Sequence, residues 1–234
     1  MTLNHYSRRI IGLATGQDGL IYIGTEPESD LNVVGHLFSF DATTGIFADK
    51  GAVTGASSVG CGLTTGPDGR IYGGTYPNGH FFVYNPPNDT LTDKGQPVPS
   101  VVSISALVVG SDGRIFGGTL PDGHLFTYDP ASDSFSDKGQ AIPGQNGIAS
   151  LIACDGIMYG GTFSYPGSGL SAHLFEYDIV TQSFTDLGVA VPGERTIEAL
   201  VRTSRGVIYG GTSFGGHLFS YDCRHLIHLP MVIR

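Results

Sequence analysis

Short runs of alternating apolar and polar residues, separated by tight-turn signals, recur along the chain. The clearest example begins with an apolar run at 103–109, followed by an Asp-Gly pair at 112–113 and a second run at 114–119. A third run at 124–128 alternates strictly, and a fourth centres on Phe135. Alternation with a period of two is typical of half-buried strands, and an Asp-Gly pair favours a two-residue hairpin. We therefore predict four antiparallel strands in this segment.

The same pattern occurs five times, marked by a Gly-Thr pair after the second run and a histidine at the start of the third. The threonines are Thr25, Thr75, Thr119, Thr162 and Thr212, and the histidines are His36, His80, His124, His173 and His217. Periods of 43 to 50 residues with four strands each are typical of propeller blades. We predict an all-β fold, a five-bladed β-propeller of four-stranded antiparallel blades that forms one domain over residues 1–234. The predicted blades are about 8–51, 57–95, 101–139, 145–188 and 194–234, with inner strands near 8–15, 58–65, 102–109, 146–153 and 195–202.

The run Asp-Gly-Arg-Ile-Tyr-Gly-Gly-Thr at 68–75 resembles the second blade strand of kelch, gluconolactonase-type and streptogramin-lyase-type propellers. The resemblance covers every repeat and implies the propeller fold. The chain contains no Trp, so the Trp-Asp ending of WD40 repeats is absent, and the acidic trio of the arabinanase-like glycosidases is not visible. The resemblance therefore implies a fold and carries no catalytic residue to this chain.

The last unit departs from the pattern after Tyr221 and Asp222, so its outer strand is predicted to be irregular. Only residues 1–7 precede the first inner strand, which is too short a segment to supply that missing strand. We predict that the apolar residues of 226–233 form the outer strand of blade five or cover its edge. If they leave the edge unpaired, the chain is expected to dimerise through it; otherwise it is expected to be a monomer.

Composition narrows the class of protein. The chain has 40% hydrophobic and 14% charged residues with 36 Gly and 13 Pro, a profile of strands and turns with almost no helix. A net charge of -9 and scattered basic residues argue against nucleic acid as a partner, and the absence of a long apolar run argues against a membrane span. We predict a cytoplasmic location. An odd number of cysteines without a secretory signal predicts free thiols at Cys61, Cys154 and Cys223.

The five equivalent histidines are candidates for metal ligands or general bases, because imidazole suits both roles. A site needs a few convergent groups, however, and this histidine recurs in every blade beside a threonine. We therefore predict that each imidazole is mostly buried and bonds to the hydroxyl or backbone near the threonine of its own blade. No cofactor or metal is predicted, with binding through two or three of these histidines as the alternative.

Charges break the symmetry of the inner strands in blades one and five. The equivalent positions two residues before the aligned leucine are Ile11, Cys61, Ser105, Ala149 and Glu198. Further charges at Arg8, Arg9, Glu194 and Arg195 are predicted to line the channel mouth together with Glu198, on the face that carries the variable loops. The alternative is an ion-pair cluster that joins the first blade to the last.

Three functions are compatible with these features. The first is a binding module for a small polar or anionic ligand, such as a carbohydrate or sugar acid, held by Arg8 and Arg195 and stacked on Tyr76, Phe163 or Tyr165. The second is a lyase or hydrolase that uses Glu198 or a histidine as its base, with metal assistance if the repeat histidines bind a metal. Retaining glycosidase chemistry is disfavoured, because the inner strands offer a single carboxylate. The third is a scaffold for protein interaction.

Overall fold

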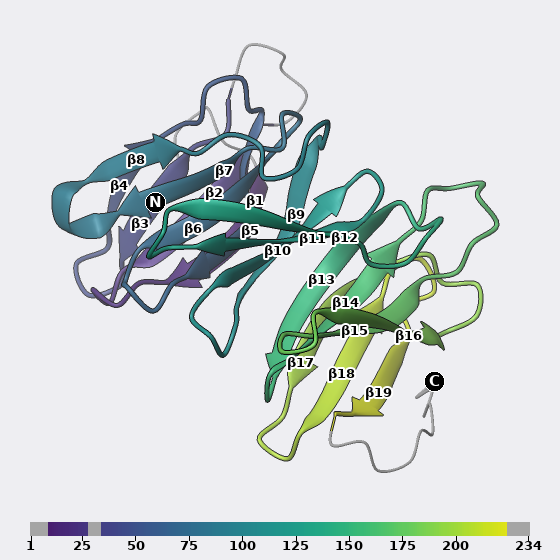
Figure 1. The fold of residues 1–234 in the computed structure, drawn as a ribbon. Helices are drawn as coiled ribbons and strands as arrows, with labels where there is room; N and C mark the ends of the chain where they lie inside the picture. Colours follow the sequence, from purple (N-terminus) through teal and green to yellow (C-terminus); the bar gives the residue numbers. More distant parts are fainter. Residues whose placement is uncertain (1–8, 28–33, 224–234) are drawn as a thin grey trace.

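A computed structural model describes residues 9–27 and 34–223, and these form five antiparallel sheets arranged side by side (Figure 1). The first sheet is β1 (Arg9–Thr15), β2 (Ile21–Glu26), β3 (Leu37–Asp41) and β4 (Ile46–Gly51); the second is β5 (Ser58–Thr65), β6 (Ile71–Tyr76), β7 (Phe81–Asn85) and β8 (Thr90–Asp93). The third is β9 (Ser103–Val109), β10 (Ile115–Leu120), β11 (His124–Asp129) and β12 (Ser134–Gln140); the fourth is β13 (Gly147–Cys154), β14 (Ile157–Phe163), β15 (His173–Asp178) and β16 (Ser183–Val189). The fifth has three described strands, β17 (Ile197–Arg202), β18 (Val207–Thr212) and β19 (Leu218–Asp222). The predicted all-β propeller of four-stranded blades with an irregular last blade is confirmed.

Helix is confined to one short turn in the described ranges, a 3-10 segment at Pro86–Asn88. No helix in those ranges is long and apolar enough to cross a membrane.

A tight turn joins the inner strand of each blade to the second strand, and the sequence explains its shape. In blade two, Gly69 has a φ of +79°, a conformation that glycine adopts without the steric cost of a Cβ. The Asp68 side chain accepts a hydrogen bond from the Arg70 backbone N–H at 3.1 Å and another from the Tyr72 hydroxyl at 2.7 Å. In blades one and two, the Asp-Gly pair thus fixes the turn and its Asp also holds a buried tyrosine of the second strand.

Two consecutive glycines in the second strand allow the blades to pack closely. In blade three, Gly117 lies under the ring of Phe126 from the same blade, and a Cβ at Gly118 would lie 2.6 Å from the Cβ of Ile148 in blade four. The first glycine therefore serves packing within the blade, and the second serves packing between blades.

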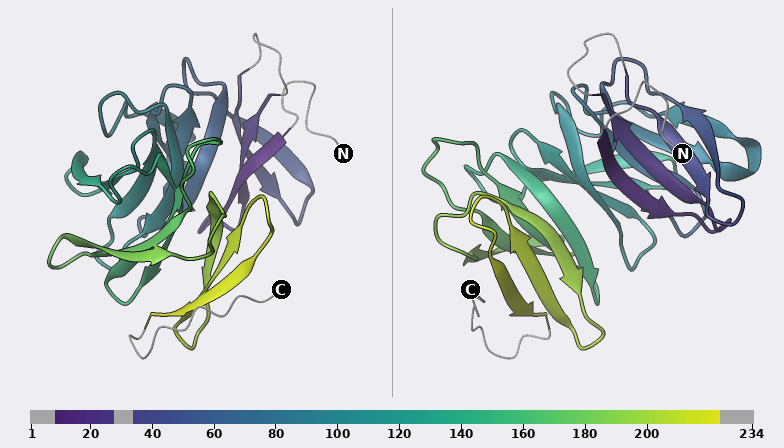
Figure 2. Two further views of the ribbon diagram at one scale, coloured as in Figure 1. Left: turned by 90° about the vertical axis from the view of Figure 1, so that its right-hand side faces the viewer. Right: turned by 180° about the vertical axis from the view of Figure 1, so that it is seen from behind.

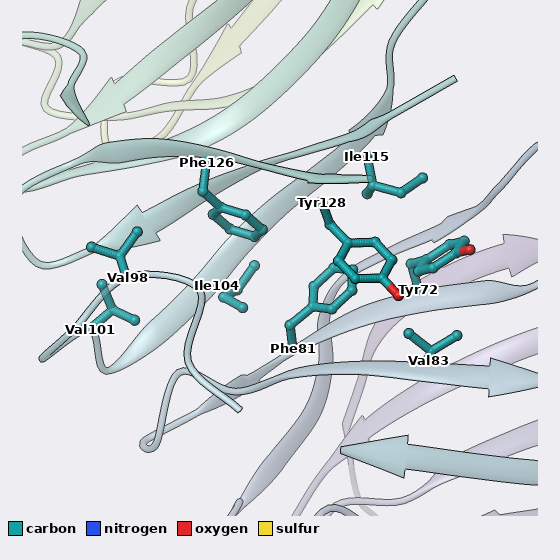
Figure 3. Packing of buried hydrophobic residues seen from close by; sticks show 9 residues of the cluster. All are labelled: Tyr72, Phe81, Val83, Val98, Val101, Ile104, Ile115, Phe126 and Tyr128. Carbon is teal, nitrogen blue, oxygen red and sulfur yellow. The ribbon is translucent and has the colours of Figure 1, made fainter. Parts of the chain in front are cut away.

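The apolar core is divided among the joints between neighbouring blades. Between blades two and three, Tyr72 and Phe81 pack against Ile104, Phe126 and Tyr128 (Figure 3). The ring centroids of Phe81 and Tyr128 are 4.9 Å apart, a distance at which tilted aromatic pairs attract. Because blades two, three and four bury both faces in this way, each internal joint depends on two adjacent repeats.

The described parts of the first and last blades do not pack on each other. β1 packs on β5, β5 on β9, β9 on β13 and β13 on β17. Within the described residues, β1 and β17 do not pack on each other as these four pairs do. Figure 1 and the right view of Figure 2 show the first and last sheets at opposite ends of the array. The segment 226–233, which was predicted to complete blade five, lies outside the described residues, so that prediction stays open.

The prediction of three free thiols is wrong for two of them. Cys154 at the end of β13 and Cys223 just after β19 form a disulfide that links blades four and five, and Cys61 is free. Stacking of neighbouring blades brings the two sulfurs together across 69 residues of sequence. Disulfides are typical of oxidising compartments, whereas the sequence predicted a cytoplasmic location, which stays a prediction.

Candidate functional site

A β-bulge interrupts the pairing of each inner strand with the second strand of its blade. Ile11, Ser105, Ala149 and Glu198 are each the one residue skipped where the register shifts. In blade two the shift is wider and includes Cys61 together with Gly60, whose φ is +87°. A bulge leaves its residue out of the ladder and redirects its side chain. The five positions identified by aligning the sequence repeats are therefore the bulge positions.

These five bulge residues line one cavity of about 320 Å³. Other lining residues include Glu26, Leu120 and Phe163, which end the second strands of blades one, three and four. The cavity thus lies where inner strands begin and second strands end, which is the face of the variable loops. All five blades contribute to it, although the described parts of the first and last blades do not pack on each other.

Oxygen acceptors dominate the polar part of this cavity. Glu26 is 3.4 Å from Arg9 of the same blade, while no hydrogen bond or ion pair from the described part of the chain reaches Glu198. Thr196 is 2% exposed, and its Oγ1 has no hydrogen-bond partner among the described residues. No basic side chain belongs to the described lining. The cavity is therefore suited to a ligand that donates hydrogen bonds.

Cys61 is the free thiol of the cavity. Burial is the main cause that raises the pKa of this thiol to about 11, and the nearby Glu26 carboxylate is the second cause. The thiolate is the reactive form of cysteine, so the group is protonated near neutral pH and is unsuited to nucleophilic attack.

Of the two residues predicted to bind an anion, the described one, Arg195, is not among the lining residues of the cavity. The guanidinium of Arg195 lies over the Phe214 ring, 3.9 Å from its centroid. Glu194, predicted at the channel mouth, is instead buried in its own blade, where it accepts hydrogen bonds from His217 and the Gly215 backbone. Arg8 lies outside the described residues. No ion pair between described residues joins blade one to blade five, so the alternative of an ion-pair cluster receives no support there.

Of the aromatic candidates, Phe163 is the one in the cavity lining. Tyr76 and Tyr165 are 47% and 46% exposed and are not among the lining residues. The ring of Tyr165 meets that of Phe163 edge-on at 5.0 Å, so it supports the ring that faces the cavity.

Thr196 was missed by sequence reasoning, although a signal was present. Ser58, Ser103 and Thr196 stand directly before the branched residue of the inner strand in blades two, three and five. Ser103 and Thr196 line the cavity. A small hydroxyl residue that recurs directly before the branched residue of the inner strand was thus a sequence signal for a polar rim of the cavity.

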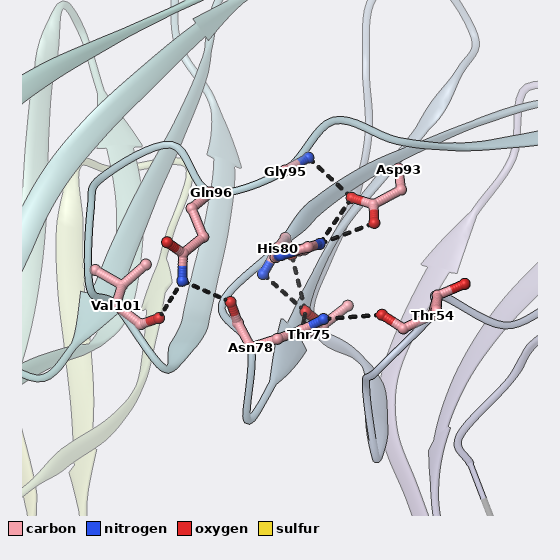
Figure 4. A network of polar contacts seen from close by, with 8 residues as sticks. All are labelled: Thr54, Thr75, Asn78, His80, Asp93, Gly95, Gln96 and Val101. Carbon is pink, nitrogen blue, oxygen red and sulfur yellow. Dashed lines mark hydrogen bonds and ion pairs between the residues drawn. The ribbon is translucent and has the colours of Figure 1, made fainter.

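The repeat histidines have a structural role that differs from the predicted one. In blade two, the backbone N–H of His80 donates to Thr75 Oγ1 at 2.9 Å, whereas its imidazole Nδ1 lies 2.8 Å from the Asp93 carboxylate (Figure 4). Asp93 also accepts a hydrogen bond from the Gly95 backbone at 2.8 Å. The threonine therefore binds the histidine backbone, and the imidazole joins the third strand to the fourth. The imidazoles are also less buried than predicted, because their side chains are 25 to 35% exposed.

The same imidazole contact occurs in all five blades. In blades one, three and four the partners of His36, His124 and His173 are Asp49, Asp137 and Asp186. Blade five has no fourth strand among its described residues, and Glu194 from the preceding loop binds His217 Nδ1 at 3.1 Å. Burial raises the pKa of Glu194, but hydrogen bonds from Gly215, Thr212 and His217 outweigh it and lower that pKa overall. Within the described ranges, no three His, Cys, Asp or Glu side chains are grouped so as to hold a metal ion.

A second hollow lies on the opposite face, between blades two and three. It is lined by the Asp-Gly turns, and its charges are already paired: Arg70 is 3.6 Å from Asp68, and Arg114 is 3.7 Å from both Asp112 and Asp129. Exposed ion pairs of this kind contribute little to stability. They leave neither arginine of the described lining unpaired for a ligand.

Comparison with known proteins establishes the fold alone. No family model and no curated protein matches the sequence. Among solved structures, the chain is similar to one in a nidogen/laminin complex, with 11% identity, a TM-score of 0.66, and coverage of 95% of this chain and 79% of that one. A putative gluconolactonase gives 13% identity, a TM-score of 0.60, and coverage of 90% and 73%. A chain of the mitotic checkpoint complex gives 11% identity, a TM-score of 0.63, and coverage of 95% and 65%. These structures are β-propellers, and so is the fold of this chain.

Proposed function

We propose that this propeller is a binding module for a small neutral sugar or polyol, held in the cavity of the bulge residues. The observation that carries the proposal is that bulge residues from all five blades line one cavity of about 320 Å³. This volume lies near the lower end of ligand pockets in proteins, which span roughly 300–1,000 Å³. A cavity of that size suits one or two sugar rings.

The lining residues favour a ligand that carries hydroxyl groups over one that carries carboxylates. Glu198 and Thr196 offer acceptors without partners among the described residues, and Glu26 offers a second carboxylate. An anionic ligand would meet two carboxylates and no basic group of the described lining, and like charges repel one another. Phe163 adds an apolar surface on which a sugar ring can stack.

Catalysis by a lyase or hydrolase is the alternative at the same cavity. Glu198 remains the candidate base, whereas the protonated thiol of Cys61 is not a candidate nucleophile. A bound ligand that is converted to product over time, as followed by proton NMR, would replace the binding proposal with the enzymatic one.

A screen of neutral sugars and polyols, with uronic acids and amino sugars as charged comparisons, tests the proposal by thermal shift and titration calorimetry. We expect a neutral compound to bind. Glu198→Gln is expected to weaken it by about tenfold, because a charge-assisted hydrogen bond is lost, and Thr196→Val by about fivefold, the effect of one neutral hydrogen bond.

The matched control is Asp122→Asn, which removes one exposed negative charge outside the cavity lining and keeps a residue that tolerates the φ of 71° at that position. Its affinity is expected to equal that of the wild type. Preferential binding of uronic acids, or equal losses in all three variants, would refute the proposed ligand class.

A further inference from the structure

Four internal joints bury the same residue of the inner strand against the same glycine of the preceding blade. The buried residues are Val59, Ile104, Ile148 and Ile197, each 0% exposed. The glycines that they meet are Gly24, Gly74, Gly118 and Gly161. At each internal joint, one blade therefore supplies a branched side chain, and the preceding blade supplies a glycine that leaves room for it.

In blade one, no described blade packs on the equivalent surface. Ile10 occupies the position of the four buried residues but is 53% exposed, and Leu13 is 61% exposed where its equivalents in the other blades are half-buried. Phe38 is also partly exposed, whereas Phe82 and Phe126 at the same position are 0% exposed. We call Ile10, Leu13 and Phe38 the blade-one end face.

Blade five presents the complementary surface, and no described residue packs on it either. A Cβ added at Gly211 would meet no atom within 4 Å, although Gly211 is equivalent to the four glycines at the joints. Leu218 is 42% exposed, while its equivalents Leu37 and Leu125 are 0% exposed. Val201 on the inner strand is 60% exposed. We call Val201, Gly211 and Leu218 the blade-five end face.

We propose that the blade-five end face of one molecule binds the blade-one end face of a second copy, head to tail. The internal joints indicate that a second copy is the binding partner. The empty space beside Gly211 corresponds to the space that Ile148 fills beside Gly118. Ile10 is the residue at that repeat position that no described blade covers. The two end faces of one molecule lie at opposite ends of the array (Figures 1 and 2), so the faces of two molecules can meet without distorting any internal joint.

Such an interface is heterologous, because each copy uses a different surface. A dimer then still has one free face at each end, and association continues unless the rotation closes a ring. The proposal therefore predicts a weight-average mass that rises above the 24.6 kDa of one chain and keeps rising with concentration.

Two variants each remove one face while leaving the other. Ile10→Glu places a charge on the blade-one end face, and Gly211→Leu fills the space on the blade-five end face, where the free chain has room for it. Each variant alone is expected to remain at 24.6 kDa in analytical ultracentrifugation. Mixed in equal amounts, they retain one intact pair of faces and are expected to form a complex of twice that mass and no larger.

The matched control is Val180→Glu, an equally charged replacement of a residue that is 86% exposed in a turn away from both end faces. It is expected to associate like the wild type, and circular dichroism and thermal melting check that every variant folds. A wild-type chain that stays monomeric at its highest soluble concentration would overturn the proposal. This holds even if the two end faces of one molecule are then found to contact each other. Folded variants that fail to form the mixed complex would overturn it as well.

Discussion

At Gly118 an added methyl group would lie 2.6 Å from both Cβ and Cγ2 of Ile148, so Gly118→Ala would force blades three and four apart. Gly211 occupies the same place in the repeat but faces open space. The same substitution at the two glycines therefore separates the effect of the joint from the effect of the strand. Neither residue has a positive φ, so backbone strain does not enter the comparison.

The magnitude at Gly118 follows from two opposing contributions. Overpacking of a dense core costs about 1–3 kcal/mol, while replacing glycine in a strand by alanine gains roughly 0.5–1 kcal/mol through the unfolded state. Gly118→Ala is thus expected to lower the free energy of unfolding by about 1–2 kcal/mol, which corresponds to a fall of roughly 2–8 °C in melting temperature. Gly211→Ala is expected to leave stability unchanged or to raise it by about 0.5 kcal/mol.

Urea unfolding followed by circular dichroism measures both variants, at a protein concentration low enough that association is absent. Equal destabilisation by the two substitutions would show that Gly211 is packed, which contradicts the open space that it faces. An unchanged midpoint for Gly118→Ala would contradict the close packing of the internal joints.

Other predictions concern the contacts that hold single blades together. His217→Ala should lower the free energy of unfolding by about 2–3 kcal/mol, because the buried Glu194 carboxylate loses a partner, whereas His124→Ala should cost less than about 1 kcal/mol, because its partner is partly exposed; equal losses in urea unfolding would contradict this difference. Reduction of the Cys154–Cys223 disulfide should cost about 4 kcal/mol, the chain-entropy value for a link across 69 residues, and a Cys154→Ser, Cys223→Ser variant should no longer respond to reductant. Truncation after Cys223 should lower the melting temperature and promote aggregation, because the removed apolar segment is predicted to complete blade five; unchanged melting would show that the segment is dispensable.

The blades were predictable because one repeat carries the information for its own four strands. The third inner strand was predicted at 102–109 and lies at Ser103–Val109, and the fifth was predicted at 195–202 and lies at Ile197–Arg202. Asp-Gly turns and alternating runs are local signals, so five copies reinforce one another. The lack of packing between the described parts of blades one and five depends instead on how blades stack, and no single repeat encodes it.

The candidate site was predictable only in part. Alignment of the repeats identified Glu198 and its four equivalents, but the bulge that redirects them becomes visible only when the inner strand is paired with its neighbour. Arg195 was assigned to the site because charge is rare in these strands, and the structure instead places its guanidinium on Phe214. Alignment of the repeats thus identified the unusual residues, but the direction in which their side chains point depends on strand register.

The predictions for the partners of the repeat histidines and for two of the three cysteines were wrong for different reasons. His80 and Asp93 are 13 residues apart, and the same spacing separates His124 from Asp137, so a constant offset in the first four blades was available as a signal for the pair. No comparable signal joined Cys154 to Cys223, because their contact arises from the packing of separate blades.

The proposed ligand site depends on the convergence of the bulge residues on one cavity, and Cys61 can report on that convergence directly. Cys61 is the one free thiol, and its raised pKa of about 11 means that its rate of modification increases by about tenfold per pH unit below that value, so all rates are compared at one pH. Ala149→Trp, in blade four, should slow the modification of Cys61 in blade two several-fold, because both residues line the same cavity. Ala131→Trp, in the hollow of the opposite face, should leave the rate unchanged. Equal rates in the wild type and in both folded variants would contradict a shared cavity, and with it the proposed ligand site.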